Sequence, residues 1–117
     1  MRLLLVEDDE GVREGLADVL GYHGDVNAVG DLLEARRLLS EGSFDLIVAD
    51  LRIGGDRSGG KKIVGAARER GVPVVIVSGS SREEIDRALG EDRADGILTK
   101  PFLLEDFERL IARFKRS

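Results

Sequence analysis

The sequence predicts an α/β domain in which a five-stranded parallel sheet is covered by helices on both faces. Two observations support this fold class. Short apolar runs alternate with amphipathic stretches five times along the 117 residues, and each run is continuous rather than alternating apolar and polar. Continuous apolar runs are typical of strands buried on both faces, as in parallel sheets. Five β–α units with short connections therefore indicate a doubly wound, three-layer arrangement.

The strands are expected at the apolar runs, and the helices where apolar residues recur every three or four positions. The predicted strands cover residues 3–6, 25–29, 46–49, 74–77 and 96–98, of which the second is the weakest. The helices that follow them in turn present these apolar faces: Val12, Leu16, Val19 and Leu20; Leu32, Ala35, Leu38 and Leu39; Ile63, Ala66 and Ala67; Ile85, Ala88 and Leu89; and, as the clearest stripe, Leu104, Phe107, Ile111 and Phe114. Residues 1–117 are expected to form a single domain.

The composition narrows the classes of function. Hydrophobic residues make up 42% of the chain and charged residues 35%, which is typical of a soluble globular domain. The net charge of −5 argues against direct binding to nucleic acid. No apolar run approaches the ~18–20 residues of a membrane span, and the first residues do not resemble a signal peptide. Without cysteine there is no disulfide and no thiolate site, and a cytoplasmic setting is expected.

Polar side chains gather at the carboxyl ends of the predicted strands. The first strand is followed by Glu7, Asp8 and Asp9, the third by Asp50, the fourth by Ser78 and the fifth by Thr99, Lys100 and Pro101. Doubly wound sheets place their functional groups in the crevice beyond these ends. Five of these groups are therefore expected to converge there: the acids Glu7, Asp8 and Asp50, the hydroxyl of Ser78 and the ammonium group of Lys100.

These residue types predict a specific chemistry. Glu7, Asp8 and Asp50 would repel one another if packed together. A Mg²⁺ ion removes this conflict, because it binds one or two carboxylates, waters and phosphate oxygens. Lys100 supplies a positive charge and Ser78 a hydroxyl donor for a phosphoryl group. The sequence therefore predicts Mg²⁺-dependent phosphoryl transfer to Asp50 as a carboxylate nucleophile.

Four segments of the chain resemble the signature blocks of response-regulator receiver domains of two-component signalling, such as the chemotaxis regulator. They are the segments 4–9 (LLVEDD), 45–52 (DLIVADLR), 74–79 (VVIVSG) and 98–102 (LTKPF). Each block is weak by itself, but four in order at family-like spacing are highly specific. The resemblance implies a flavodoxin-like fold with strand order 2-1-3-4-5.

The resemblance also implies roles for the acidic residues. Asp50 matches the phosphoacceptor of the family. Glu7 and Asp8 match the acidic pair that organises Mg²⁺, with Asp8 as the more direct ligand. The family's metal also binds a backbone carbonyl two residues after the phosphoacceptor, which here belongs to Arg52.

Further positions match around the expected phosphoryl group. Ser78 matches the switch hydroxyl and Lys100 the lysine of the family, while Pro101 falls where the family has a cis peptide bond. Gly79 would leave room for the incoming phosphoryl group. The chain would then be a signalling phosphoacceptor rather than an enzyme, although slow autodephosphorylation is compatible with this role.

The resemblance implies protein partners. A histidine kinase or a histidine phosphotransfer protein would supply the phosphoryl group. The face formed by the fourth helix, the fifth strand and the fifth helix, including Arg87, Phe102 and Arg109, would contact a second copy or an effector protein.

Some positions depart from the common pattern. Ile97 stands where many receivers have an aromatic residue, so the usual coupling of hydroxyl to aromatic ring is not expected. Arg52 and Ser80 occupy positions that tune phosphoryl lifetime in the family, and a lifetime unlike that of the chemotaxis regulator is expected. Five glycines between residues 54 and 65 predict a conformationally loose loop and helix start.

Several residues have simpler explanations. Asp9 and Glu10 are expected to be acids at a helix N-terminus. Ser80 or Ser81 is expected to cap the fourth helix, with Glu83 and Glu84 in its first turn. His23, the single histidine, is expected in a helix-to-strand turn without a catalytic role.

Three alternatives compete with a phosphoacceptor. Residues 55–61 match the spacing of a nucleotide-binding P-loop, but Lys62 stands where a serine or threonine is required. A phosphohydrolase of the haloacid-dehalogenase type needs a second aspartate two residues after the nucleophile, where this chain has Arg52. A degenerate receiver that acts only as a binding module would lack one of the site residues, and none is missing.

Overall fold

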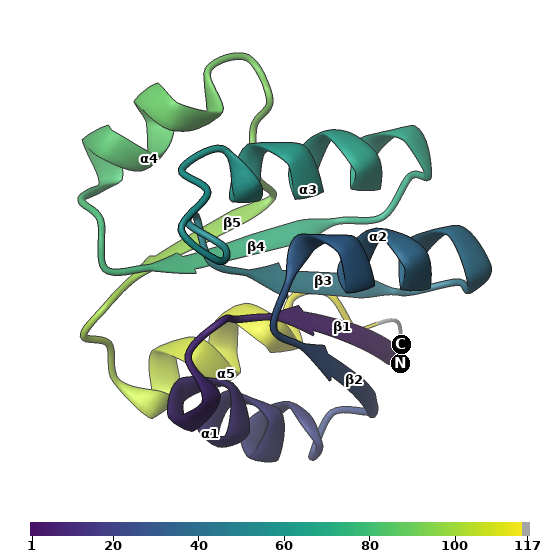
Figure 1. Cartoon of the computed structure of the whole chain (residues 1–117). Helices are drawn as coiled ribbons and strands as arrows, with labels where there is room; N and C mark the ends of the chain where they lie inside the picture. The colour runs from purple at the N-terminus through teal and green to yellow at the C-terminus, as the bar shows by residue number, and fades with distance from the viewer. Residues whose placement is uncertain (116–117) are drawn as a thin grey trace.

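A computed structural model describes residues 1–115 and contains five strands that alternate with five helices (Figure 1). In chain order they are β1 (Arg2–Val6), α1 (Glu10–Leu20), β2 (Asp25–Val29), α2 (Leu32–Glu41), β3 (Leu46–Ala49), α3 (Gly59–Glu69), β4 (Val74–Ser78), α4 (Arg82–Leu89), β5 (Gly96–Thr99) and α5 (Leu104–Ala112). All five predicted strands are confirmed. Ser78 and Thr99, which were expected just after their strands, are the last residues of β4 and β5.

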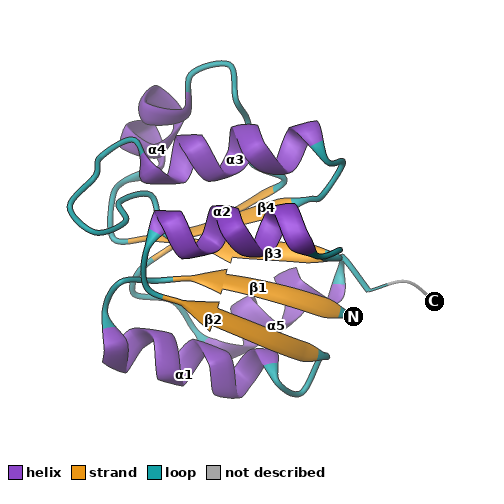
Figure 2. Cartoon of the chain, turned by 45° about the vertical axis from the view of Figure 1, so that its right-hand side comes forward, coloured by secondary structure: helices purple, strands orange, loops and turns teal. Residues whose placement is uncertain are grey.

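The strands form one parallel sheet in the order β2-β1-β3-β4-β5, which confirms the predicted topology. In the register of the sheet, Leu5 of β1 pairs with Ala28 of β2 on one side and with Val48 of β3 on the other. Helices α1 and α5 cover one face of the sheet, and α2, α3 and α4 cover the other (Figure 2). The carboxyl ends of the strands therefore lie together at one edge.

The alternation of side chains along each strand divides the core into two halves. Leu4 and Val6 of β1 pack beneath α2, α3 and α4, together with Ile63 and Ile85. Leu3 and Leu5 point to the opposite face and pack with Leu20, Phe107 and Ile111 of α1 and α5. Because the inner strands are buried on both faces, their sequences are continuously apolar.

Two predictions about helix N-termini are confirmed. Asp9 is the N-cap of α1, where its carboxylate accepts a hydrogen bond from the amide of Val12 at 3.0 Å. Ser81 is the N-cap of α4 and forms a capping box with Glu84. Such caps satisfy backbone amides that have no partner within the helix.

Two expectations about packing are wrong. Leu104 was placed on the apolar stripe of the last helix, but its side chain is 57% exposed, because it lies in the first turn, beyond the sheet face that Phe107 and Ile111 cover. The glycine-rich segment is not uniformly loose. A Cβ atom on Gly60 would lie 2.8 Å from the Leu51 Cα, and one on Gly59 2.9 Å from the Ile53 Cβ. These two glycines are required for close packing, whereas Gly54 and Gly55 have positive φ angles.

Within residues 1–115, no helix has both the length and the apolar character needed to cross a bilayer.

Candidate functional site

Side chains from three strand ends meet at the carboxyl edge of the sheet. Lys100, directly after β5, donates from Nζ to Glu7 Oε1 at 3.0 Å and to Asp50 Oδ2 at 3.4 Å. Glu7 follows β1 and Asp50 follows β3, so one ammonium group bridges the ends of two strands that are neighbours in the sheet. The convergence expected from the strand ends is therefore present for these three residues. The peptide bond between Lys100 and Pro101 is cis, as predicted.

Glu7 is the most enclosed acid of the site. It is only 3% exposed, and its second carboxylate oxygen, Oε2, accepts a hydrogen bond from the Asp9 amide at 3.2 Å. Burial raises the pKa of Glu7 above its ordinary value of 4.5, although the hydrogen bonds from Lys100 and from the Asp9 amide oppose this rise. Glu7 thus points to Lys100 and the chain interior.

The Lys100 ammonium group places one positive charge beside the two carboxylates, Glu7 and Asp50. Burial lowers the pKa of the Lys100 ammonium group, but the hydrogen bond to Glu7 and the charges of Asp50 and Glu7 outweigh it, so the net pKa is raised above 10.5. The ammonium group therefore remains charged at neutral pH. The Lys100 side chain is 27% exposed, and the Asp50 side chain is 17% exposed.

Asp50 faces an open cavity at the edge of the sheet. Its Oδ1 atom accepts a hydrogen bond from the Leu51 amide at 2.6 Å, and its Oδ2 atom contacts Lys100. Asp8, Arg52 and Ser78 line the same cavity. The Asp8 side chain is held by the Gly54 amide, which donates to Asp8 Oδ2 at 3.1 Å.

The last residue of β4, Ser78, and the loop residues Gly79 and Ser80 also line this cavity. The Ser78 side chain is buried, and its hydroxyl oxygen accepts a hydrogen bond from the Ser80 amide at 3.2 Å. Gly79 has open space where a Cβ atom would stand. Arg52 and Ser80, predicted to influence phosphoryl lifetime, thus both line the same cavity.

A carboxylate beside an ammonium group, open to solvent and flanked by a hydroxyl, suits phosphoryl transfer. A family model for the response regulator receiver domain matches residues 3–115 of the chain. The chain belongs to this family. It is a receiver domain of the two-component response regulators, the phosphoacceptor module of these systems.

Relatives of this receiver domain include two regulators. The regulatory protein VirG of Agrobacterium tumefaciens strain 15955 is 35% identical over 108 residues, which cover 90% of this chain and 40% of VirG. The transcriptional regulatory protein CiaR of Streptococcus pneumoniae is 35% identical over 120 residues, which cover all of this chain and 53% of CiaR. The receiver domain thus spans about half, or less, of the length of these relatives.

A solved structure supports the fold. The receiver domain of the sensor histidine kinase PA1611 from Pseudomonas aeruginosa has a TM-score of 0.81 and 22% identity, and the match covers 97% of this chain and 95% of that one. That structure is described with a magnesium ion coordinated in its active-site cleft. Receiver domains in general bind Mg²⁺ in the active site.

The residues at the cavity fit such an ion. Asp8, Asp50 and Arg52 all line the cavity, and the first two carry carboxylates. Among residues 1–115, no cluster of three or more acidic, histidine or cysteine ligands is preformed. Mg²⁺ typically binds one or two carboxylates and keeps several waters. Glu7 is not among the residues that line this cavity.

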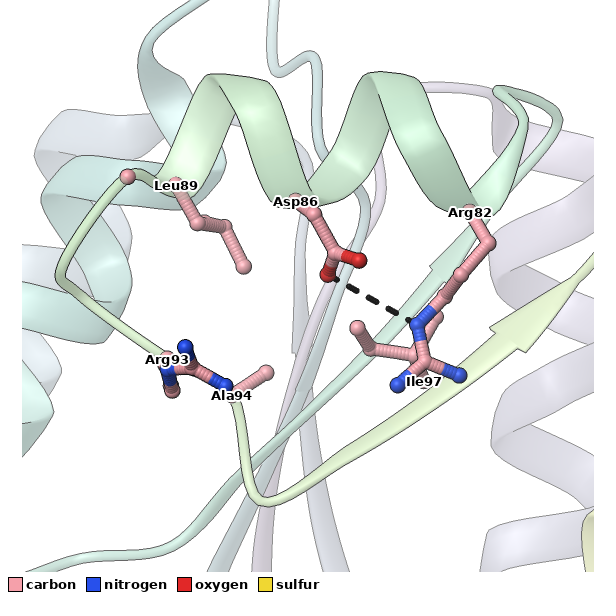
Figure 3. Close-up of a pocket in the computed structure, with 7 residues that line it drawn as sticks. Arg82, Asp86, Leu89, Arg93, Ala94 and Ile97 are labelled. Carbon is pink, nitrogen blue, oxygen red and sulfur yellow. Dashed lines mark ion pairs between the residues drawn. The ribbon is translucent and has the colours of Figure 1, made fainter.

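Ile97 borders a separate pocket of about 200 Å³ between α4 and β5 (Figure 3). Leu89 and Ala94 line the pocket beside it, and Arg82 and Asp86 form an ion pair across 3.6 Å on the α4 side. Ile97 is partly buried against the core under α4. Because isoleucine carries no ring or hydroxyl, it cannot form the hydrogen bond that a tyrosine at this position would donate.

Three other expectations concern residues around the site. Phe102, assigned to a partner surface, is partly buried and stacks on Phe107 with ring centroids 5.5 Å apart. His23 lies in the turn between α1 and β2, as predicted, and contacts Glu108 of α5. Lys62, the misfitting residue of the P-loop-like segment, pairs with Asp56 at 2.7 Å.

One charged residue that lines the cavity was not predicted. Glu84 was expected only as an acid in the first turn of α4, yet it also lines the cavity that contains Asp50. The spacing of Ser81 and Glu84 signals a capping box in the sequence. Its position beside the cavity depends on the path of the loop between β4 and α4, for which the sequence offers no signal.

Proposed function

We propose that Asp50 is the phosphoacceptor of this receiver domain, and that Lys100 and Ser78 hold the phosphoryl oxygens. The observation that carries this proposal is the position of the Asp50 carboxylate, which contacts Lys100 Nζ at 3.4 Å and faces the open cavity. An ammonium group beside the nucleophile stabilises the negative charge that the phosphoryl group brings. Ser78 stands at the end of the neighbouring strand, β4.

The donor would be the phosphohistidine of a histidine kinase or of a histidine phosphotransfer protein. An Asp50 carboxylate oxygen attacks phosphorus, an O–P bond forms and the P–N bond to the donor imidazole breaks. The imidazole leaves with the electron pair of that bond and takes up a proton. Asp50 becomes an acyl phosphate whose oxygens accept hydrogen bonds from Lys100 Nζ and the Ser78 hydroxyl.

Asp8, Asp50 and the backbone carbonyl of Arg52 would hold Mg²⁺, which would supply positive charge to neutralise the phosphoryl group. Glu7 supports the binding of the phosphoryl group indirectly, because its carboxylate fixes Lys100 through the hydrogen bond of 3.0 Å. The buried Glu7 side chain thereby positions the ammonium group that Asp50 needs. Slow autodephosphorylation by water would return Asp50 to its free form.

Receiver domains of response regulators interact with histidine kinases and with effectors. For this chain, we infer a partner surface on α4, β5 and α5 that includes the exposed side chains of Arg87 and Arg109. Phe102 contributes less to it, because its ring packs on Phe107. A second copy or an effector protein would bind there after a shift in the conformation of α4.

The proposal is tested by intact mass after incubation with acetyl phosphate, with and without Mg²⁺. The wild type is expected to gain the mass of one phosphoryl group only when Mg²⁺ is present. Asp50→Asn is expected to gain none. Asp18→Asn, which changes an exposed aspartate of α1, is the matched control and is expected to behave like the wild type.

A gain that persists in Asp50→Asn would refute the assignment of this residue. If the wild type gains no mass, a phosphorylated histidine kinase replaces acetyl phosphate as the donor. Failure with both donors would favour a degenerate receiver that acts only as a binding module.

A further inference from the structure

The first turn of α4 is held by a side chain that also belongs to the phosphorylation cavity. Glu84 lines the cavity together with Asp50. The same carboxylate closes the capping box of α4, where its Oε1 atom accepts hydrogen bonds from the Ser81 amide at 3.5 Å and from the Ser81 hydroxyl at 3.1 Å. One carboxylate therefore connects the cavity with the start of a helix.

These bonds are long. Hydrogen bonds to a carboxylate are typically about 2.5–2.7 Å from a hydroxyl and about 2.7–3.2 Å from an amide, and each contact of Glu84 Oε1 exceeds the range for its donor. The reciprocal bond, from the Glu84 amide to the Ser81 hydroxyl, is 3.1 Å long. The Glu84 carboxylate is thus the weakly held side of the box, the side that a repulsive force would open.

The charges around the cavity supply such a force. The residues that line it include three acids, Asp8, Asp50 and Glu84, and one base, Arg52. A phosphoryl group on Asp50 would add roughly one negative charge to this set. Mg²⁺ would bind beside Asp8 and Asp50, whereas Glu84 lies on the wall formed by α4. Glu84 is therefore the lining acid outside the proposed Mg²⁺ site, and the added negative charge would repel it.

The loop before α4 is held at its other end by a second cavity side chain. Ser78 Oγ accepts the hydrogen bond of the Ser80 amide at 3.2 Å. When the Ser78 hydroxyl turns to a phosphoryl oxygen, this contact weakens at the same time as the Glu84 contact. Both restraints on residues 79–81 thus depend on side chains that a phosphoryl group would engage or repel.

We propose that Glu84 is a charge-sensing positioning residue: phosphorylation of Asp50 repels its carboxylate, opens the capping box with Ser81 and loosens the first turn of α4. The proposal rests on the phosphorylation of Asp50 proposed above. It gives α4 a response to phosphorylation that does not need an aromatic residue at position 97. The free protein keeps the box closed, so the loosened turn appears only in the phosphorylated state.

The test is amide hydrogen exchange at Ser81 and Glu84, measured by NMR on free and phosphorylated protein. Phosphorylation by acetyl phosphate and Mg²⁺ is expected to speed exchange at these amides on the order of fivefold, the effect of losing one typical helix cap. In Glu84→Gln this increase is expected to vanish. Glutamine still closes a capping box, but it carries no charge for the phosphoryl group to repel.

Glu83→Gln is the matched control. Glu83 occupies the same first turn and has the same charge, but it takes no part in the capping box, which pairs Ser81 with Glu84. This variant is expected to keep the full wild-type response. Equal increases in exchange for Glu84→Gln and the wild type, with both phosphorylated by intact mass, would overturn the role of Glu84. A wild type that takes up no phosphoryl group from acetyl phosphate or a kinase would instead overturn the proposed function, and this role with it.

Discussion

Removal of the Lys100 charge tests how the charges at the sheet edge are balanced. At the 3.0 Å between Lys100 Nζ and Glu7 Oε1, an effective dielectric constant of about 20 gives an attraction of about 5 kcal/mol before desolvation is deducted. Loss of one partner of a buried pair costs about 3–5 kcal/mol, because the other charge stays buried alone. Glu7 is 3% exposed but Lys100 is 27% exposed. We therefore expect Lys100→Met to lower the free energy of unfolding by about 3 kcal/mol at pH 8, the lower end of that range.

The loss of stability in Lys100→Met depends on pH because it depends on the protonation of Glu7. Burial already raises the pKa of Glu7 above 4.5, and Lys100 opposes this rise, so Lys100→Met is expected to raise the pKa further. The folded variant then keeps a proton that the unfolded chain releases, and stability falls as pH rises from 4.5 through the folded pKa. The raised pKa of Lys100 keeps its charge, and hence its stabilising effect, throughout this range in the wild type. The defect of the variant should therefore be smaller at pH 5 than at pH 8.

Urea unfolding at both pH values, in EDTA to exclude divalent cations, measures the effect. The set comprises the wild type, Lys100→Met, Glu7→Gln and the double variant. Lys62→Met is the control, because Lys62 pairs with Asp56 at the exposed surface and should cost less than about 1 kcal/mol. Equal losses for Lys100→Met at the two pH values would refute the reasoning. So would a double variant no more stable than Lys100→Met at pH 8.

Three further outcomes are expected. Ile47→Ala, at a fully buried strand position, should lower the free energy of unfolding by about 2–5 kcal/mol in urea, whereas Leu33→Ala, at a side chain 81% exposed, should change it by less than about 0.5 kcal/mol. Asp8→Asn should weaken Mg²⁺ binding by calorimetry, while Asp18→Asn should not; equal affinities would remove Asp8 from the ligand set. Arg52→Asn should change the decay rate of the phosphorylated protein by about two- to fivefold, since an exposed charge contributes up to about 1 kcal/mol; an unchanged rate would contradict a role in lifetime.

Much of the fold was predictable because it depends on local patterns. The inner strands are continuously buried, so runs such as residues 46–49 are apolar throughout and distinguishable from amphipathic helices. Asp9 and Ser81 cap helices through bonds to residues three positions away, and such short-range bonds leave a sequence signal. Leu104 was misplaced because a 3.6-residue period defines one face of a helix but not where the sheet beneath it ends.

The sequence by itself determined the two-faced burial of the strands and the chemical types at their carboxyl ends: acids after β1 and β3, a hydroxyl on β4 and an ammonium group after β5. Only the tertiary structure decided which of these charged groups contact one another. Lys100 lies between Glu7 and Asp50, residues 93 and 50 positions away, and it leaves Glu7 in the interior while Asp50 faces the cavity. Likewise, the path of the β4–α4 loop, not the local pattern, places Glu84 beside that cavity. The burial of these groups and the distances between them set their electrostatic energies. Both arise only when separate segments of the chain pack together.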